Sequence, residues 1–164
     1  MRAEVVSMDA KHPDKEAIKR AGQILQNGGL VAFPTETVYG LGGNALDSRA
    51  SMKIYAAKGR PSDNPLIIHI ADMSSLPKIV SEIPAKAQLL AEKFWPGPLT
   101  MILPKAEIVP GETTGGLDSV AVRFPSDLIA QELIKAAGGF VAAPSANTSG
   151  RPSPTRAEHV EEDL

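Results

Sequence analysis

One segment of the sequence gathers the residue types that bind anions. It runs Lys58-Gly-Arg-Pro-Ser-Asp-Asn-Pro-Leu-Ile-Ile-His-Ile70 and sets two cations, an amide and a histidine around two prolines. Each proline fixes its own φ angle and keeps the residue before it out of the helical region. We therefore expect a stiff, extended loop that presents Lys58, Arg60 and Asn64 outward. Because Arg supplies a planar fork and Lys a compact charge, this loop suits a phosphate; the alternative is a solvated turn with incidental charges.

Two further polar loops each follow a short apolar strand. The first is Thr35–Asn44, after the strand expected at 30–33, and the second begins after Ala143. Ligands of α/β sheets usually bind at such strand ends. Hydroxyl and amide groups that could fix a small polar molecule belong to Thr35, Thr37, Ser145, Thr148, Ser149, Asn44, Asn64 and Asn147.

Two polar residues interrupt apolar strands. Arg123 is a lone cation in the run 119–124, which indicates a carboxylate or phosphate partner; the alternative is an edge residue with its head in water. His69 lies near the end of the run 66–70 and could donate to or accept from a ligand. A histidine in this position also occurs as a purely structural residue, and its cationic neighbours favour the functional interpretation.

The remaining sequence excludes several chemistries. Gly40-Leu-Gly-Gly43 does not fit the dinucleotide fingerprint, and there is no glycine-lysine-Ser/Thr phosphate loop and no serine in a nucleophile elbow. The chain has no cysteine, and its three histidines stand in unrelated contexts, so a histidine or cysteine metal cluster is not indicated. Hydroxyls, amides and cations favour an enzyme that works by positioning and charge neutralisation, as in transfer at a phosphate.

The composition is that of a globular domain. With 164 residues and 43% hydrophobic content, the chain can bury one core of its own. Its net charge of −2 gives no overall attraction to nucleic acid or membranes, so any such site must be a local patch. Since no signal-peptide core and no bilayer-spanning apolar run is evident, we expect a cytoplasmic protein without a membrane partner.

Strands and helices are predicted to alternate along the chain. We expect strands at 30–33, 66–70, 99–103, 119–124 and 140–143, and helices at 13–27, 47–59, 84–94, 127–137 and from 155. The segment 34–44 is expected to be a loop. This alternation is typical of an α/β layered domain. The strand order stays open, because the strands are short and their connections vary.

Five longer motifs occur in order across nearly the whole chain. They are Phe33-Pro-Thr-Glu-Thr-Val-Tyr-Gly-Leu-Gly42, Lys58-Gly-Arg60 with Asn64-Pro-Leu-Ile-Ile-His69, Phe94-Trp-Pro-Gly97 with Leu99-Thr100, Val120-Ala-Val-Arg123, and Ala143-Pro-Ser-Ala-Asn147. Together they closely resemble the YrdC-like family of threonylcarbamoyl-AMP synthases. The resemblance implies the three-layer α/β fold called YrdC/RibB-like, in which a twisted mixed sheet surrounds a deep cleft.

The same resemblance implies an activity, its partners and its site. A nucleotidyltransferase of this family makes L-threonylcarbamoyl-AMP and pyrophosphate from L-threonine, bicarbonate and ATP. The tRNA-threonylcarbamoyl transferase machinery downstream uses that product to make threonylcarbamoyl-adenosine in tRNA. By position, threonine would be held by Thr37, His69, Arg123 and Ser145. The catalytic residues would be Lys58 and Arg60, and the nucleotide would be held by Lys58, Arg60, Asn64, Asn147, Ser119 and Thr155. Mg²⁺ is expected with ATP; its protein ligands are unassigned, and Glu36 is the nearest carboxylate.

The resemblance also bears on the extent of the chain, and one alternative function stays open. Family members continue with a glycine-rich stretch, a Glu-Ser-Thr motif and a Leu-Arg segment, so residues 1–164 would be a catalytic domain truncated at its C-terminal end, of uncertain activity. The alternative function is a module that binds double-stranded RNA or tRNA without catalysis. The net charge of −2 and the lack of an Arg/Lys cluster weigh against it.

Overall fold

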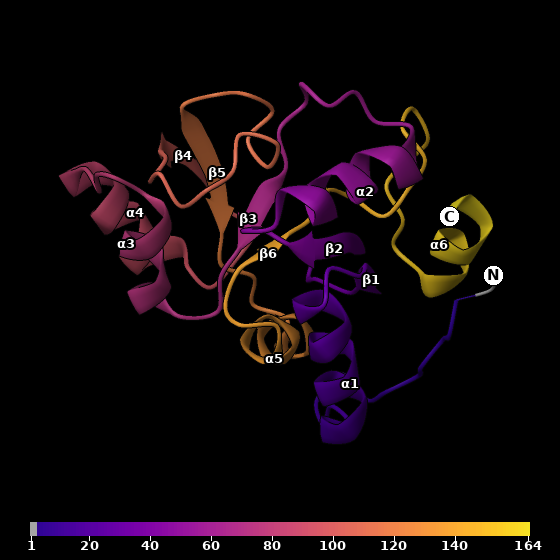
Figure 1. The fold of residues 1–164 in the computed structure, drawn as a ribbon. Helices are drawn as coiled ribbons and strands as arrows, with labels where there is room; N and C mark the ends of the chain where they lie inside the picture. Colours follow the sequence, from indigo (N-terminus) through magenta and orange to yellow (C-terminus); the bar gives the residue numbers. More distant parts are fainter. Residues whose placement is uncertain (1–2) are drawn as a thin grey trace.

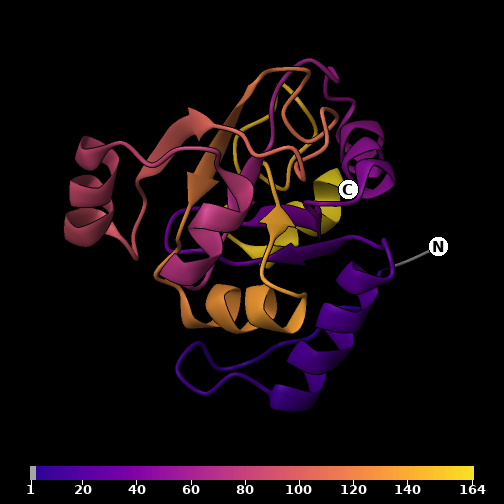
Figure 2. The same ribbon diagram turned by 60° about the vertical axis from the view of Figure 1, so that its left-hand side comes forward.

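The computed structural model describes residues 3–164 and shows a mixed β-sheet between helices (Figures 1 and 2). The sheet has six strands in the order β1-β2-β6-β3-β5-β4. In chain order the elements are α1 (Lys15–Gln26), β1 (Val31–Phe33), β2 (Gly40–Asn44), α2 (Ser48–Lys58), β3 (Ile67–His69), the 3-10 helix η1 (Met73–Ser75), α3 (Leu76–Ile79), α4 (Ala85–Phe94), β4 (Thr100–Pro104), β5 (Ser119–Arg123), α5 (Leu128–Ala136), β6 (Val141–Ala142) and α6 (Ala157–Asp163). The α/β prediction is confirmed. Among the described residues, no helix has the length and apolar character needed to cross a membrane.

The bounds of α2 follow from local signals at its two ends. The Asp47 carboxylate caps its start by accepting the Arg49 backbone N–H at 2.9 Å. Gly59 ends the helix in the left-handed region, with φ of 60°, where a glycine carries no Cβ penalty. The helix therefore ends at Lys58, one turn before the proline-rich segment begins.

The strand β2 is where the sequence prediction is wrong, because Gly40–Asn44 was expected to be a loop. It pairs antiparallel with β1 on one side and β6 on the other. A Cβ at Gly42 would lie 2.9 Å from both the Phe33 ring and the Val141 side chain. The glycines let the Phe33 ring pack across the strand. Close packing thus outweighs the low strand propensity of glycine.

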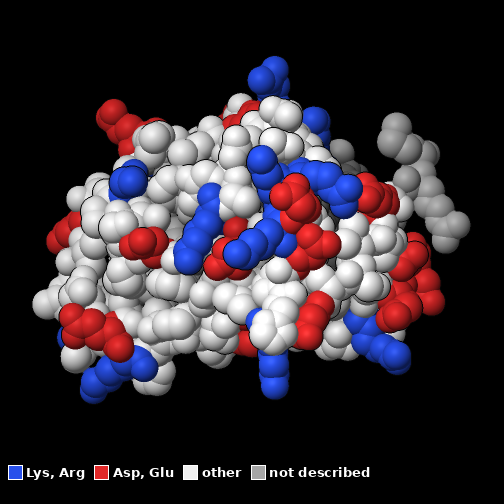
Figure 3. Space-filling model, turned by 90° about the horizontal axis from the view of Figure 1, so that it is seen from below, with Lys and Arg blue, Asp and Glu red and all other residues white. Residues whose placement is uncertain are grey.

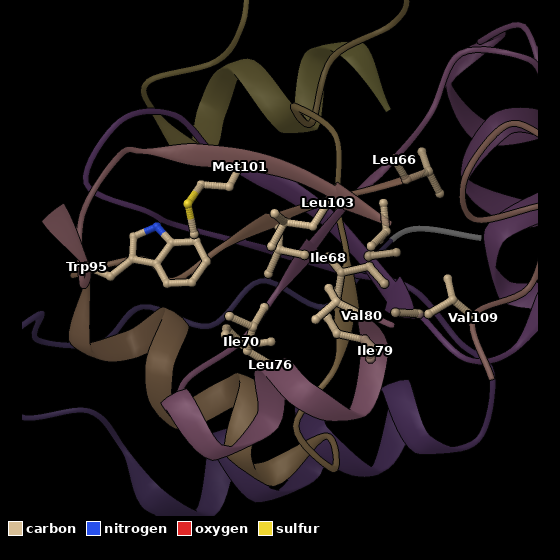
Figure 4. Close-up of a cluster of buried hydrophobic side chains, with 14 of the residues drawn as sticks. Leu66, Ile68, Ile70, Leu76, Ile79, Val80, Trp95, Met101, Leu103 and Val109 are labelled. Carbon is tan, nitrogen blue, oxygen red and sulfur yellow. The ribbon is translucent and has the colours of Figure 1, made fainter. Parts of the chain in front are cut away.

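Two hydrophobic cores lie on opposite faces of the sheet and give the fold three layers. The larger core joins α2, α3 and α4 to the sheet and includes the fully buried Ile68, Leu76 and Ile79 (Figure 4). The second core packs α1 and α5 against the other face, over Phe33 and Val141. Figure 1 shows α1 and α5 side by side below the sheet, and α3 and α4 grouped at the left, beside β4 and β5.

The second core covers only part of its face, and the remainder is open. Residues paired across neighbouring strands point to the same side, so the register identifies the side chains of this open sheet face. They are Ile67 and His69 of β3, Thr100 and Ile102 of β4, and Ser119, Ala121 and Arg123 of β5. Ile102 is 72% exposed although it lies within a strand. A surface of the sheet is therefore available beside His69 and Arg123.

Candidate functional site

A cavity of about 310 Å³ lies at the border between the covered and open parts of this sheet face. Its wall is closed where the start of β2 meets the segment after β6: Leu41 N donates to Pro144 O at 2.9 Å, and Ala146 N donates to Tyr39 O at 2.8 Å. The cavity is lined by Thr35, Val38, Tyr39, Gly40, Arg60, Pro65, Ile67, His69, Arg123, Ala143, Pro144 and Ser145. The structure thus brings together four of the predicted site residues: Arg60, His69, Arg123 and Ser145.

Arg123 lies at one end of the cavity and is almost fully buried. Its Nη1 donates to the Thr37 hydroxyl at 3.1 Å, its Nε points to Gly97 O at 3.4 Å, and its Nη2 donates to Glu36. Burial lowers the pKa of the guanidinium from its usual value. The cation predicted to face an anion therefore has an anionic partner within the chain, and the predicted threonine residue Thr37 contacts it directly.

His69 stands beside Arg123, because the two residues are paired between β3 and β5. Its Nδ1 contacts Ile67 O at 3.0 Å, and its ring packs edge-on against Phe33 with centroids 5.9 Å apart. Burial lowers the pKa of His69 to about 4. At neutral pH the ring is uncharged, so it can exchange a hydrogen bond with a ligand in the cavity but brings no positive charge to it.

Arg60 is the second guanidinium of the cavity. Its Nη2 donates to Pro65 O at 2.7 Å and its Nε to Asn64 O at 3.2 Å. Asn64 N also donates to Pro61 O at 3.1 Å, so the segment forms a turn rather than the extended loop that was expected. These backbone contacts hold the Arg60 side chain against the cavity while leaving it half-buried.

Lys58 does not point outward as predicted. The residue is 1% exposed, and its Nζ donates to Ser145 O and, at 2.7 Å, to Asn147 O. Burial, followed by the nearby Arg60 charge, lowers the Lys58 pKa to about 8. The end of α2 turns the side chain inward, where its ammonium ties the helix to the loop that carries Ser145. Lys58 is therefore a tether behind the cavity wall and not part of its lining.

The other predicted nucleotide residues do not line the cavity. Asn64 and Thr155 are exposed, and Ser119 lies on the open sheet face, four residues before Arg123 on β5. Asn147 is buried, and its Nδ2 donates to Thr148 O at 2.9 Å and Arg151 O at 2.8 Å. Its Oδ1 has no partner within residues 3–164.

Sequence reasoning missed how Glu36 and Ser126 contribute. Both Ser126 N and Ser126 Oγ donate to Glu36 Oε2 at 2.5 Å, while Glu36 Oε1 accepts from Arg123. Tyr39 was also missed, although it lines the cavity. The tripeptide Thr35-Glu-Thr37, which holds a carboxylate between two hydroxyls, was the only available signal.

Mg²⁺ has no ready protein site in the part of the chain that the structure describes. No group of three or more His, Cys, Asp or Glu side chains that could hold a metal occurs there. Both oxygens of Glu36, the nearest carboxylate candidate, already accept hydrogen bonds. The residues present therefore do not fit a protein-held metal, and no step is assigned to one.

Comparisons with known proteins identify close relatives. The threonylcarbamoyl-AMP synthase of Pyrococcus abyssi is 60% identical over 147 residues, covering 90% of this chain and 43% of that protein. The Bacillus subtilis protein of the same name is 55% identical over 148 residues, again with 90% and 43% covered. A crystal structure of P. abyssi Sua5 complexed with L-threonine superposes with a TM-score of 0.91 at 57% identity, covering 93% of this chain and 45% of that one.

The chain thus spans less than half of the length of these relatives. The sequence model of the Sua5/YciO/YrdC family, described as "Telomere recombination", matches residues 23–164. That match includes all the cavity-lining residues. The resemblance inferred from the five motifs is confirmed, and the chain belongs to the Sua5/YciO/YrdC family.

Proposed function

We propose that this chain carries the site for synthesis of L-threonylcarbamoyl-AMP from L-threonine, bicarbonate and ATP, with release of pyrophosphate. The observation that carries the proposal is that two guanidiniums, those of the almost fully buried Arg123 and the half-buried Arg60, line one cavity of about 310 Å³. A reaction that joins an amino acid to a nucleotide needs a cation for a carboxylate and a cation for phosphates in one enclosed space.

Threonine is assigned to the Arg123 end of the cavity. The fork of Arg123 can bind a carboxylate through two parallel hydrogen bonds, which Lys cannot do. Neutral His69 and the Ser145 hydroxyl offer polar contacts that suit the hydroxyl and amine of threonine. The relative crystallised with L-threonine is 57% identical to this chain, which supports the assignment.

The nucleotide is assigned to the Arg60 end and the open sheet face. Ser119 lies on that face about 13 Å along β5 from Arg123, a distance that leaves room for both substrates. Between them lie the apolar side chains of Ala121 and Ile67, on which a flat base can rest. Asn64 borders Arg60, and Asn147 and Thr155 belong to the loop behind the cavity, the latter beside Pro154, whose carbonyl accepts from Tyr39 N at 2.8 Å.

The chemistry asks little covalent participation of the protein. A carbamate oxygen of N-carboxylated threonine bonds to the α-phosphorus, and the bond from that phosphorus to the bridging oxygen breaks, so that pyrophosphate leaves with the electron pair. Arg60 neutralises charge on the phosphates as it develops. Lys58 holds Ser145 and Asn147 in place through their carbonyls and acts on the reaction by positioning this loop. Mg²⁺ would accompany the triphosphate.

Pyrophosphate release tests the proposal. We expect release from ATP only when L-threonine and bicarbonate are both present, and its loss in Arg123→Ala. Release that needs neither threonine nor bicarbonate would overturn the proposal. The product then serves as donor for the tRNA-threonylcarbamoyl transferase machinery, which we propose as its consumer.

Binding of tRNA or double-stranded RNA without catalysis is the second candidate, and the surface charge weighs against it. In the face seen in Figure 3, Lys and Arg side chains are interspersed with Asp and Glu and form no single-sign area. A phosphate-binding surface would give a steep fall of affinity with salt concentration. Salt-independent or absent tRNA binding would remove this candidate.

A further inference from the structure

Glu36 occupies the position in which a ligand's carboxylate would meet Arg123. One of its oxygens accepts from Arg123 Nη2, and the other accepts from the backbone N–H and the hydroxyl of Ser126, each at 2.5 Å. The Arg123 side chain is 9% exposed and that of Glu36 is 22% exposed. A nearly buried guanidinium without a partner is costly, so Glu36 stabilises the site while no ligand is present.

Arg123 has little spare capacity for a second carboxylate while Glu36 stays. Its Nη1 already donates to Thr37 and its Nε points to Gly97 O. A bidentate carboxylate needs two neighbouring N–H groups of the fork, and a second anion beside Glu36 would add like-charge repulsion. Glu36 and the ligand therefore compete for the same cation.

The segment that carries Glu36 is suited to exchange. Glu36 and Thr37 are exposed as residues, and the turn that holds them depends on the Thr35 hydroxyl, which accepts Thr37 N and Val38 N at 3.2 Å each. No helix or strand contains them. A small backbone change in this turn can withdraw the carboxylate without disturbing the sheet that positions Arg123.

We propose that Glu36 is a displaceable internal carboxylate, which binds Arg123 in the empty cavity and is exchanged for the carboxylate of the amino-acid substrate. The inference rests on the proposed function, because it takes threonine as that substrate. It makes Glu36 a determinant of specificity, because a ligand can bind the Arg123 guanidinium only if its own carboxylate displaces that of Glu36. The apparent affinity for threonine is then the intrinsic affinity multiplied by the fraction of molecules in which Glu36 has released Arg123.

Calorimetry on Glu36→Gln tests the exchange, with Glu132→Gln as the matched control. Glu132 forms an exposed ion pair with Lys135 at 3.8 Å, away from the cavity. We expect Glu36→Gln to bind L-threonine about five- to tenfold more tightly than the parent, since the neutral amide competes poorly for the guanidinium. The control should bind like the parent. Ser126→Ala, which removes the hydroxyl but keeps the backbone N–H that donates to Glu36, should give a smaller gain.

Two further readouts separate this role from a structural one. Threoninol lacks the carboxylate, so its affinity should be unchanged in Glu36→Gln. The midpoint of urea unfolding should fall in the same variant, because Arg123 loses its partner, so stability and threonine affinity change in opposite directions. If Glu36→Gln bound threonine equally or more weakly, or lost affinity for threoninol as well, the exchange would be wrong. If the parent bound no threonine, the proposed function itself would fail.

Discussion

Replacing Arg123 by Lys should weaken the binding of threonine and leave the binding of the nucleotide nearly unchanged. A lysine keeps the positive charge but has one nitrogen in place of the three with which Arg123 meets Thr37, Glu36 and Gly97. It can therefore form at most one strong contact to the threonine carboxylate where the arginine forms two. Losing one charge-assisted hydrogen bond costs about 1.5–3 kcal/mol, which corresponds to a roughly 10- to 150-fold rise in Kd.

The same substitution should leave nucleotide binding nearly unchanged, because Ser119 and Arg123 are about 13 Å apart along β5. Isothermal calorimetry with L-threonine and, separately, with ATP measures both effects on one protein sample. Arg49→Lys is the matched control, since the Arg49 side chain on α2 is 90% exposed. Threonine binding by Arg123→Lys as tight as that of the parent, or equal losses of affinity for threonine and ATP, would refute the assignment of the threonine carboxylate to Arg123.

Three other predictions follow from the contacts of the site. Arg60→Ala should weaken the binding of ATP by about 10-fold or more and the binding of threonine by much less, as measured by calorimetry. Equal losses of the two affinities would contradict the assignment of ATP and threonine to different ends of the cavity. Lys58→Ala should lower the free energy of unfolding by at least about 2 kcal/mol, because it leaves the carbonyls of Ser145 and Asn147 without their donor; an unchanged urea midpoint would show that the tether contributes nothing. His69 has a folded-state pKa of about 4 against 6.5 when unfolded, so the unfolded chain binds more protons between these values and stability falls as the pH drops from 6.5 towards 4. In urea unfolding, His69→Gln should lose less stability than the parent between pH 6.5 and 4. An equally steep loss of stability in the variant would show that other groups cause the pH dependence.

Local signals in the sequence predict the ends of α2 correctly. An aspartate cap and a glycine in the left-handed region act within a few residues of the helix that they bound. The strand β2 could not be predicted in this way, since its glycines are explained by contacts of Gly42 with Phe33 and Val141, which are distant in sequence or on another strand. Position-specific close packing is invisible to propensity and periodicity.

In the candidate site, too, local features could be predicted from the sequence, whereas contacts between residues distant in sequence could not. His69 and Arg123 could be identified as polar residues in apolar strands, and the β3–β5 pairing makes them neighbours. The inward direction of Lys58 could not, because its partners are two backbone carbonyls of a loop nearly ninety residues later. The contact of Glu36 with Arg123 is equally long-range. A loop rich in charge indicates that a site exists, but the direction of each side chain depends on the tertiary fold.

The most direct test of the central claim is a crystal structure of the protein with L-threonine and a non-hydrolysable ATP analogue. We predict the threonine carboxylate on the fork of Arg123, with Glu36 withdrawn. The phosphates of the analogue should lie within hydrogen-bond distance of Arg60, in the same cavity as the threonine. Threonine bound away from Arg123, or phosphates bound at a surface remote from Arg60, would contradict the account.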